Sequence, residues 1–167
     1  NSPLIEEGLA ALRDGDAAAA RRAFELALGR AESGEALEGL AKALYLEREY
    51  GAAAAHCERA YAAYRRERNT TAAGRAALTA SWITGNVLGD WAVQNGWVAR
   101  ACTMLEEAGE DGPEHGWVLI SRALSQPDAQ EREALLREAV AVGRRFGDPD
   151  VEFEALSLLG GLFVMTD

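Results

Sequence analysis

The chain has 167 residues, of which 49% are hydrophobic and 26% are charged, and its formal net charge at pH 7 is −10. These proportions exclude a disordered chain and fit one folded domain with a sizeable core. Because a net acidic surface repels phosphate groups, we expect no direct binding of nucleic acid by this segment.

Turn and capping residues divide the chain into nine predicted helices. Ser2 and Pro3 predict the first helix start, because a capping hydroxyl and a proline at the first helical position are both favourable there. The predicted helical stretches are 3–15, 16–33, 34–48, 51–69, 70–89, 90–109, 113–127, 128–147 and 149–167. The chain has no alternating strand pattern and no low-complexity linker, so we expect a single all-α domain over residues 1–167.

A pattern of small, large and small residues recurs at an offset of 33 positions in the second helices of the first two pairs. The matched residues are Ala20, Phe24 and Ala27 in one helix and Ala53, Cys57 and Ala60 in the other. A period near 34 residues is typical of tetratricopeptide hairpins. The sequence therefore predicts a tetratricopeptide-like α-solenoid of antiparallel helix pairs, and such scaffolds bind partners without catalysis.

The third pair departs from this pattern. Counting back from Gly89, the position that should hold a small residue holds Trp82, and Gly85 lies one turn later. Either the helix register shifts here, or Trp82 leaves the seam between helices and faces the binding groove.

The first helix of each pair should line the concave groove of such a scaffold. The candidate groove residues are Glu38, Lys42, Tyr45, Arg75, Trp82 and Asn86. A polar and aromatic set of this kind can hold a carboxylate or a peptide backbone, so we expect a protein, peptide or small-molecule partner. The alternative is a solvated helix face with pairs four residues apart, such as Glu38 with Lys42.

The last predicted helix is apolar on almost every side. Its apolar residues are Val151, Phe153, Leu156, Leu158, Leu159, Leu162, Phe163, Val164 and Met165. A helix of this kind is expected to be buried on all sides, and solenoids usually finish with a polar capping helix. We therefore expect that the natural protein continues past Asp167, and that this segment alone forms a homodimer through its last helix.

No pattern of catalytic or metal-binding residues is present. Cys57 occupies the large position of the repeat pattern, which predicts a buried thiol, and His115 at a helix start predicts a surface or capping role. Two cysteines and two histidines, scattered along the chain, do not fit a structural zinc site. We expect neither an enzyme nor a cofactor. Trp117, near the start of a first helix, is expected in the core.

Cellular location follows from the cysteines and the apolar runs. Cys57 and Cys102 are too few for a disulfide scaffold, which favours a cytoplasmic protein. The longest apolar run, 156–165, is well short of the ~20 residues that a membrane span needs. We expect no membrane contact.

Three stretches resemble a known family. Residues 6–12 (EEGLAAL), 112–117 (GPEHGW) and 146–150 (FGDPD) resemble the N-terminal helical-repeat region of large actinobacterial LuxR-type transcriptional regulators, and the resemblance covers essentially the whole chain. It implies a ligand-sensing or partner-binding domain for a C-terminal helix-turn-helix domain that this chain does not contain. The alternatives are the regulatory repeats of an adenylate/guanylate cyclase and a free-standing adaptor protein.

Overall fold

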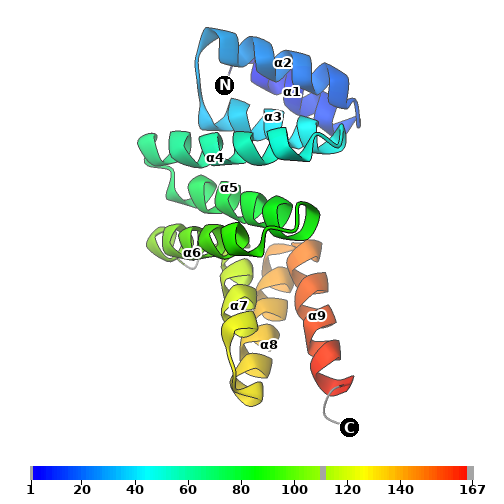
Figure 1. Ribbon diagram of the computed structural model, residues 1–167, viewed down its shortest axis with the longest axis vertical. Coiled ribbons are helices and arrows are strands. Elements are labelled where there is room, and N and C mark those ends of the chain that lie inside the picture. The colour runs from blue at the N-terminus through cyan, green and yellow to red at the C-terminus, as the bar shows by residue number, and fades with distance from the viewer. Residues whose placement is uncertain (1, 110–111, 165–167) are drawn as a thin grey trace. The chain divides into compact units, whose positions relative to one another are not determined.

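The computed structural model describes residues 2–109 and 112–164, and within these ranges every regular element is helical. The helices are α1 (Pro3–Arg13), α2 (Ala17–Arg30), α3 (Gly34–Leu46), α4 (Tyr50–Arg66), α5 (Thr70–Trp82), α6 (Trp91–Ala108), α7 (Glu114–Ser125), α8 (Ala129–Phe146) and α9 (Pro149–Val164), with a π-helical turn, η1 (Ile83–Val87), after α5 (Figure 1). The chain divides into two compact units between Ala101 and Cys102. The prediction of a single domain over 1–167 stays a prediction.

Most helix starts use the capping residues that the sequence predicts. The side chain of Asp16 accepts a hydrogen bond from the backbone N–H of Ala19 at 2.9 Å. Equivalent bonds are accepted by Ser33, Asn69, Asp90 and Asp128. Ser2 is an exception, because it stands at the N-cap position of α1 but its hydroxyl makes no capping bond. The helix boundaries are thus set largely by local side-chain chemistry.

Unit 1 is built from antiparallel neighbours, each packed on the next from α1 to α5 (Figure 1). The residues of the repeating pattern are all between 0% and 5% exposed, as a seam between helices requires. The ring of Phe24 fills a slot across Gly8 and Gly39, where an added Cβ would lie 2.7 Å and 2.3 Å from ring carbons. The predicted all-α, tetratricopeptide-like fold is confirmed for the described residues.

Unit 2 contains a separate core between α7, α8 and α9. Leu119, Leu136 and Val151 are almost fully buried in it. Gly116 lets α9 approach α7, because an added Cβ would lie 2.4 Å from a methyl carbon of Val151. Trp117 is partly buried against this core, which confirms its expected structural role.

The expectation that α9 is buried on all sides is wrong. One face of the helix holds Val151, Ala155 and Leu159, which are 0–8% exposed against α7 and α8. Phe153 is 71% exposed and Leu156 is 44% exposed, because they lie off the face that packs against the other two helices. Met165 lies outside the described residues.

The third helix pair contains both of the departures that the sequence offered as alternatives. The backbone N–H of Leu88 donates to the carbonyl of Ile83 at 3.0 Å, so the bond spans five residues and the register shifts. Trp82, immediately before this turn, is 48% exposed. Among the described residues, no helix combines the length and apolarity that a membrane crossing needs.

Candidate functional site

Two adjoining hollows lie on unit 1 and share Lys42. We call the first the polar hollow; it measures about 510 Å³ and its lining includes Leu9, Glu38, Lys42, Tyr64, Asn69 and Arg75. We call the second the aromatic pocket; it measures about 390 Å³ and its lining includes Leu12, Lys42, Tyr45, Leu46, Thr79 and Trp82. The lining comes mainly from α1, α3 and α5, the first helices of the three pairs. We call the two hollows together the groove.

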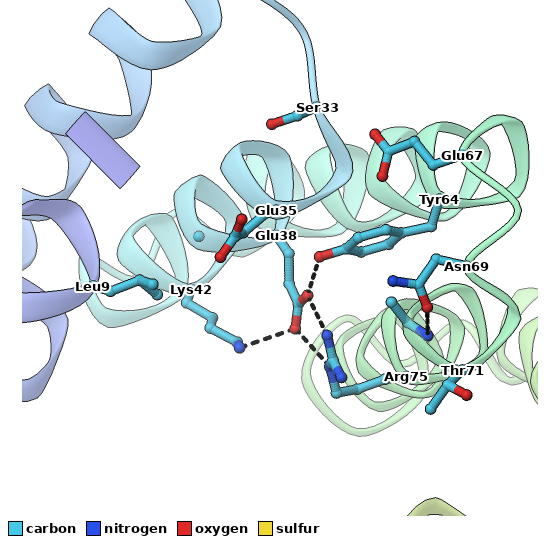
Figure 2. Close-up of a pocket in the computed structure, with 12 residues that line it drawn as sticks. Leu9, Ser33, Glu35, Glu38, Lys42, Tyr64, Glu67, Asn69, Thr71 and Arg75 are labelled. Carbon is cyan, nitrogen blue, oxygen red and sulfur yellow. Dashed lines mark hydrogen bonds and ion pairs between the residues drawn. The ribbon is translucent and has the colours of Figure 1, made fainter. Parts of the chain in front are cut away.

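Glu38 is the centre of the polar hollow, and Figure 2 shows that side chains from three helices converge on it. Arg75 donates to its two carboxylate oxygens at 3.0 and 2.9 Å, and the hydroxyl of Tyr64 donates at 2.7 Å. The Lys42 ammonium lies 2.9 Å from the same carboxylate. Glu38 is only 5% exposed, so an anionic carboxylate is held at the base of the hollow by two cations and a phenol.

The charge state of Glu38 follows from two opposed effects. Burial alone would raise the pKa of its carboxyl. The hydrogen bonds from Arg75, the charges of Lys42 and Arg75 and the Tyr64 hydroxyl outweigh burial and lower the pKa from 4.5 to about 2. Glu38 is therefore ionised at neutral pH, and the carboxylate that Lys42 and Arg75 hold is one of the protein's own.

The aromatic pocket is chemically different from the polar hollow. Tyr45, Leu46 and Trp82 expose between 37% and 53% of their surface around it. The ring of Tyr45 is held edge-on against Tyr50, with ring centroids 5.3 Å apart. The pocket can therefore accept an apolar side chain between partly fixed rings, with the Lys42 stem at the border to the polar hollow.

The groove includes five of the six candidate residues from the sequence. Glu38 and Arg75 lie in the polar hollow, Tyr45 and Trp82 in the aromatic pocket, and Lys42 in both. Asn86 is exposed in η1 and is not part of either lining. The predicted ion pair between Glu38 and Lys42 is confirmed at 2.9 Å.

Sequence reasoning missed Tyr64, which belongs to α4. It reaches Glu38 because its ring packs over Gly34, where an added Cβ would lie 2.4 Å from a ring carbon. Tyr64 and Glu38 are 26 positions apart in the sequence. A glycine at the start of α3 and a tyrosine near the end of α4 are the only signals, and neither is specific.

The remaining candidates have structural surroundings. Cys57 is 1% exposed, and burial raises the pKa of its thiol to about 12, as a buried apolar position predicts. Trp97 is 7% exposed, whereas Trp91 is 60% exposed and does not line the groove. Within the part of the chain that the structure describes, no three His, Cys, Asp or Glu residues are placed to hold a metal ion.

Comparison with known proteins adds no assignment: no protein-family model matches the chain, and no curated protein is similar to it in sequence.

Proposed function

We propose that unit 1 is a non-catalytic binding domain whose groove takes a peptide segment of a protein partner. A large apolar side chain of that segment enters the aromatic pocket. The peptide backbone then lies along the polar hollow. The observation that carries the proposal is the exposure of Trp82, Tyr45 and Leu46 around a single hollow.

The chemistry of the aromatic pocket favours binding. Exposed aromatic rings bury a large area at a small cost in side-chain entropy, which is why Trp and Tyr dominate binding energies. Trp82 is 48% exposed, so a ligand that covered it would remove apolar area from water. A solvated helix face gains nothing from a tryptophan at this position.

The polar hollow suits a peptide backbone better than an acidic group. Its two nearest cations, Lys42 and Arg75, are already engaged by Glu38. Glu35 and Glu67 also line the hollow. An additional carboxylate would meet these acids without a cation of its own, whereas neutral amides can hydrogen-bond to the hollow's side chains.

The resemblance to LuxR-type regulators supplies the wider proposal. We propose that the groove is the sensing part of a cytoplasmic bacterial transcriptional regulator. In it, partner binding would change the position of an attached helix-turn-helix domain. The cyclase and adaptor alternatives use the same groove and differ only in the domain attached to it. The observations on the groove support binding of a partner, which all three share.

The proposal is tested by selecting peptides from a displayed random library on the full chain. The selected peptides should be rich in large apolar residues. Trp82→Ala should weaken their binding by about tenfold to a hundredfold, since an anchoring aromatic contributes roughly 1.5–3 kcal/mol.

Trp91→Ala is the matched control. It removes another exposed tryptophan of unit 1, 60% exposed against 48% for Trp82, that does not line the groove. Failure to select any peptide, or equal losses from the two substitutions, would contradict the proposed function.

A further inference from the structure

A third hollow of unit 1 shares no residue with the groove. It measures about 540 Å³ and is lined by Glu32, Arg59, Tyr61, Ala62, Arg65 and Arg66. Glu32 lies in the turn between α2 and α3, and the other five residues belong to α4. We call it the arginine pocket. Its size falls in the range of small-ligand sites.

The positive charge of the arginine pocket is only partly neutralised. Arg59 and Arg66 each contact one oxygen of the Glu32 carboxylate at 2.7 Å, so two guanidinium groups share a single acid. Arg65 lies over the Tyr61 ring, 5.7 Å from its centroid, and has no acidic partner among the described residues. The lining thus carries three cations and one anion in a chain whose net charge is −10.

Aromatic contacts restrict one lining residue of the arginine pocket, Tyr61. The Tyr61 ring packs edge-on against Trp97, with centroids 5.4 Å apart. Trp97 is 7% exposed, and Arg100 lies over its ring at 4.7 Å from the centroid. Rings packed in this way restrict the position of Tyr61, over which the exposed Arg65 guanidinium lies.

We propose that the arginine pocket binds a phosphate monoester. A monoester carries about −1.5 to −2 charges at pH 7 and offers three acceptor oxygens, which matches the excess charge of the three arginines. Guanidinium groups donate paired hydrogen bonds to phosphate oxygens. A carboxylate ligand fits less well, because Glu32 already supplies a carboxylate to Arg59 and Arg66 in this pocket.

Glu32 acts in this site as a built-in competitor. Its carboxylate is exposed and occupies one N–H of each of two arginines, which leaves their other donors for a ligand. The incoming phosphate either displaces Glu32 or binds beside it against repulsion. The acidity of the rest of the chain matters less, because charges farther away than about 8 Å are screened at physiological salt.

The test is calorimetric titration of the full chain with O-phospho-L-serine and with a short alanine peptide that carries one phosphoserine. Arg59→Gln and Arg66→Gln should each weaken binding by about tenfold. Glu32→Gln should tighten it by about fivefold, since it removes the competing charge. Added salt should weaken binding in every case.

Arg22→Gln is the matched control, because Arg22 is exposed on α2, has no ion pair in the described structure and does not line the pocket. It should leave binding unchanged. Tighter binding of the peptide than of the free amino acid would indicate a phosphorylated protein as the source, and equal binding a small phosphorylated molecule. Absence of binding, Glu32→Gln without a gain, or equal effects of Arg22→Gln and Arg66→Gln would overturn the proposal.

Discussion

The Glu38 carboxylate joins three helices through side chains that the sequence does not place together. Lys42 stands four residues later on α3, so its ion pair with Glu38 follows from helix geometry alone. Arg75 and Tyr64 come from α5 and α4, and their contacts depend on how those helices pack. The contact of Glu38 with Lys42 was therefore predictable from their spacing in the sequence. The contacts with Arg75 and Tyr64 were not, because they depend on the packing of other helices.

Replacement of Glu38 by glutamine should alter the response of stability to acid. The folded-state pKa of Glu38 is lowered from 4.5 to about 2, so its stabilisation is fully present above about pH 4.5 and is lost as the pH falls toward 2. At pH 7, Glu38→Gln should lower the free energy of unfolding by about 3 kcal/mol, because it removes the buried negative charge that the hydrogen bonds from Arg75 and Tyr64 and the ion pair with Lys42 stabilise.

Urea denaturation at several pH values checks this expectation. The glutamine variant should lose less stability than the wild type as the pH falls from about 4.5 to 2. Glu35→Gln on the same helix is the control, since Glu35 makes no hydrogen bond or ion pair in the described structure. An identical acid response of the wild type and Glu38→Gln would contradict the account of this cluster.

At the scale of elements, glycines and alanines decide how closely the helices pack. Phe24 of α2 occupies space that side chains at Gly8 of α1 and Gly39 of α3 would fill. The small–large–small pattern thus records real contacts, and it predicted the pairing of helices. The same reasoning overestimated the burial of α9, because an apolar composition does not say how many neighbours a helix has.

Gly39→Ala should destabilise the protein even though alanine favours helix formation. An added Cβ would lie 2.3 Å from the Phe24 ring, which is 0% exposed and has no room to move. We expect a loss of about 1–3 kcal/mol, measured as a lower midpoint of thermal unfolding.

Gly29→Ala is the matched control for this substitution. Gly29 lies near the end of α2 with nothing within 4 Å of an added Cβ, so it should raise stability by up to about 1 kcal/mol. Changes of the same sign in the two variants would contradict the close packing of Phe24.

The π-helical turn is the element that the sequence did not resolve. Ile83–Val87 has the sequence ITGNV, in which every residue is a weak helix former, but this composition does not predict a bond that spans five residues. The one signal in the sequence was Trp82, which stands where the repeat pattern predicts a small residue. It indicated where the helix departs from the pattern, but not that the departure is a π-helical turn. The turn matters because it begins directly after Trp82, which lines the aromatic pocket.

At the scale of the whole chain, two groups of exposed apolar residues have different expected uses. Trp82, Tyr45 and Leu46 surround a pocket in unit 1. Phe153 and Leu156 lie on α9 in unit 2, where exposed apolar surface would favour the homodimer that the sequence predicts.

Phe153→Ser should abolish self-association of the chain. We expect the wild type to form dimers at high protein concentration in sedimentation equilibrium and the variant to stay monomeric, because serine removes a 71% exposed apolar side chain of α9. Leu26→Ser, which replaces a 61% exposed leucine on α2, should leave the dimer intact. A monomeric wild type would contradict the homodimer.

The central claim is that the aromatic pocket binds a partner, and nuclear magnetic resonance tests it most directly. The chain has four tryptophans, so a titration with a selected peptide can be followed at four indole N–H signals. The account predicts that the Trp82 signal shifts strongly while the signal of the exposed Trp91 stays in place. A bound peptide that leaves the Trp82 signal unchanged would contradict it.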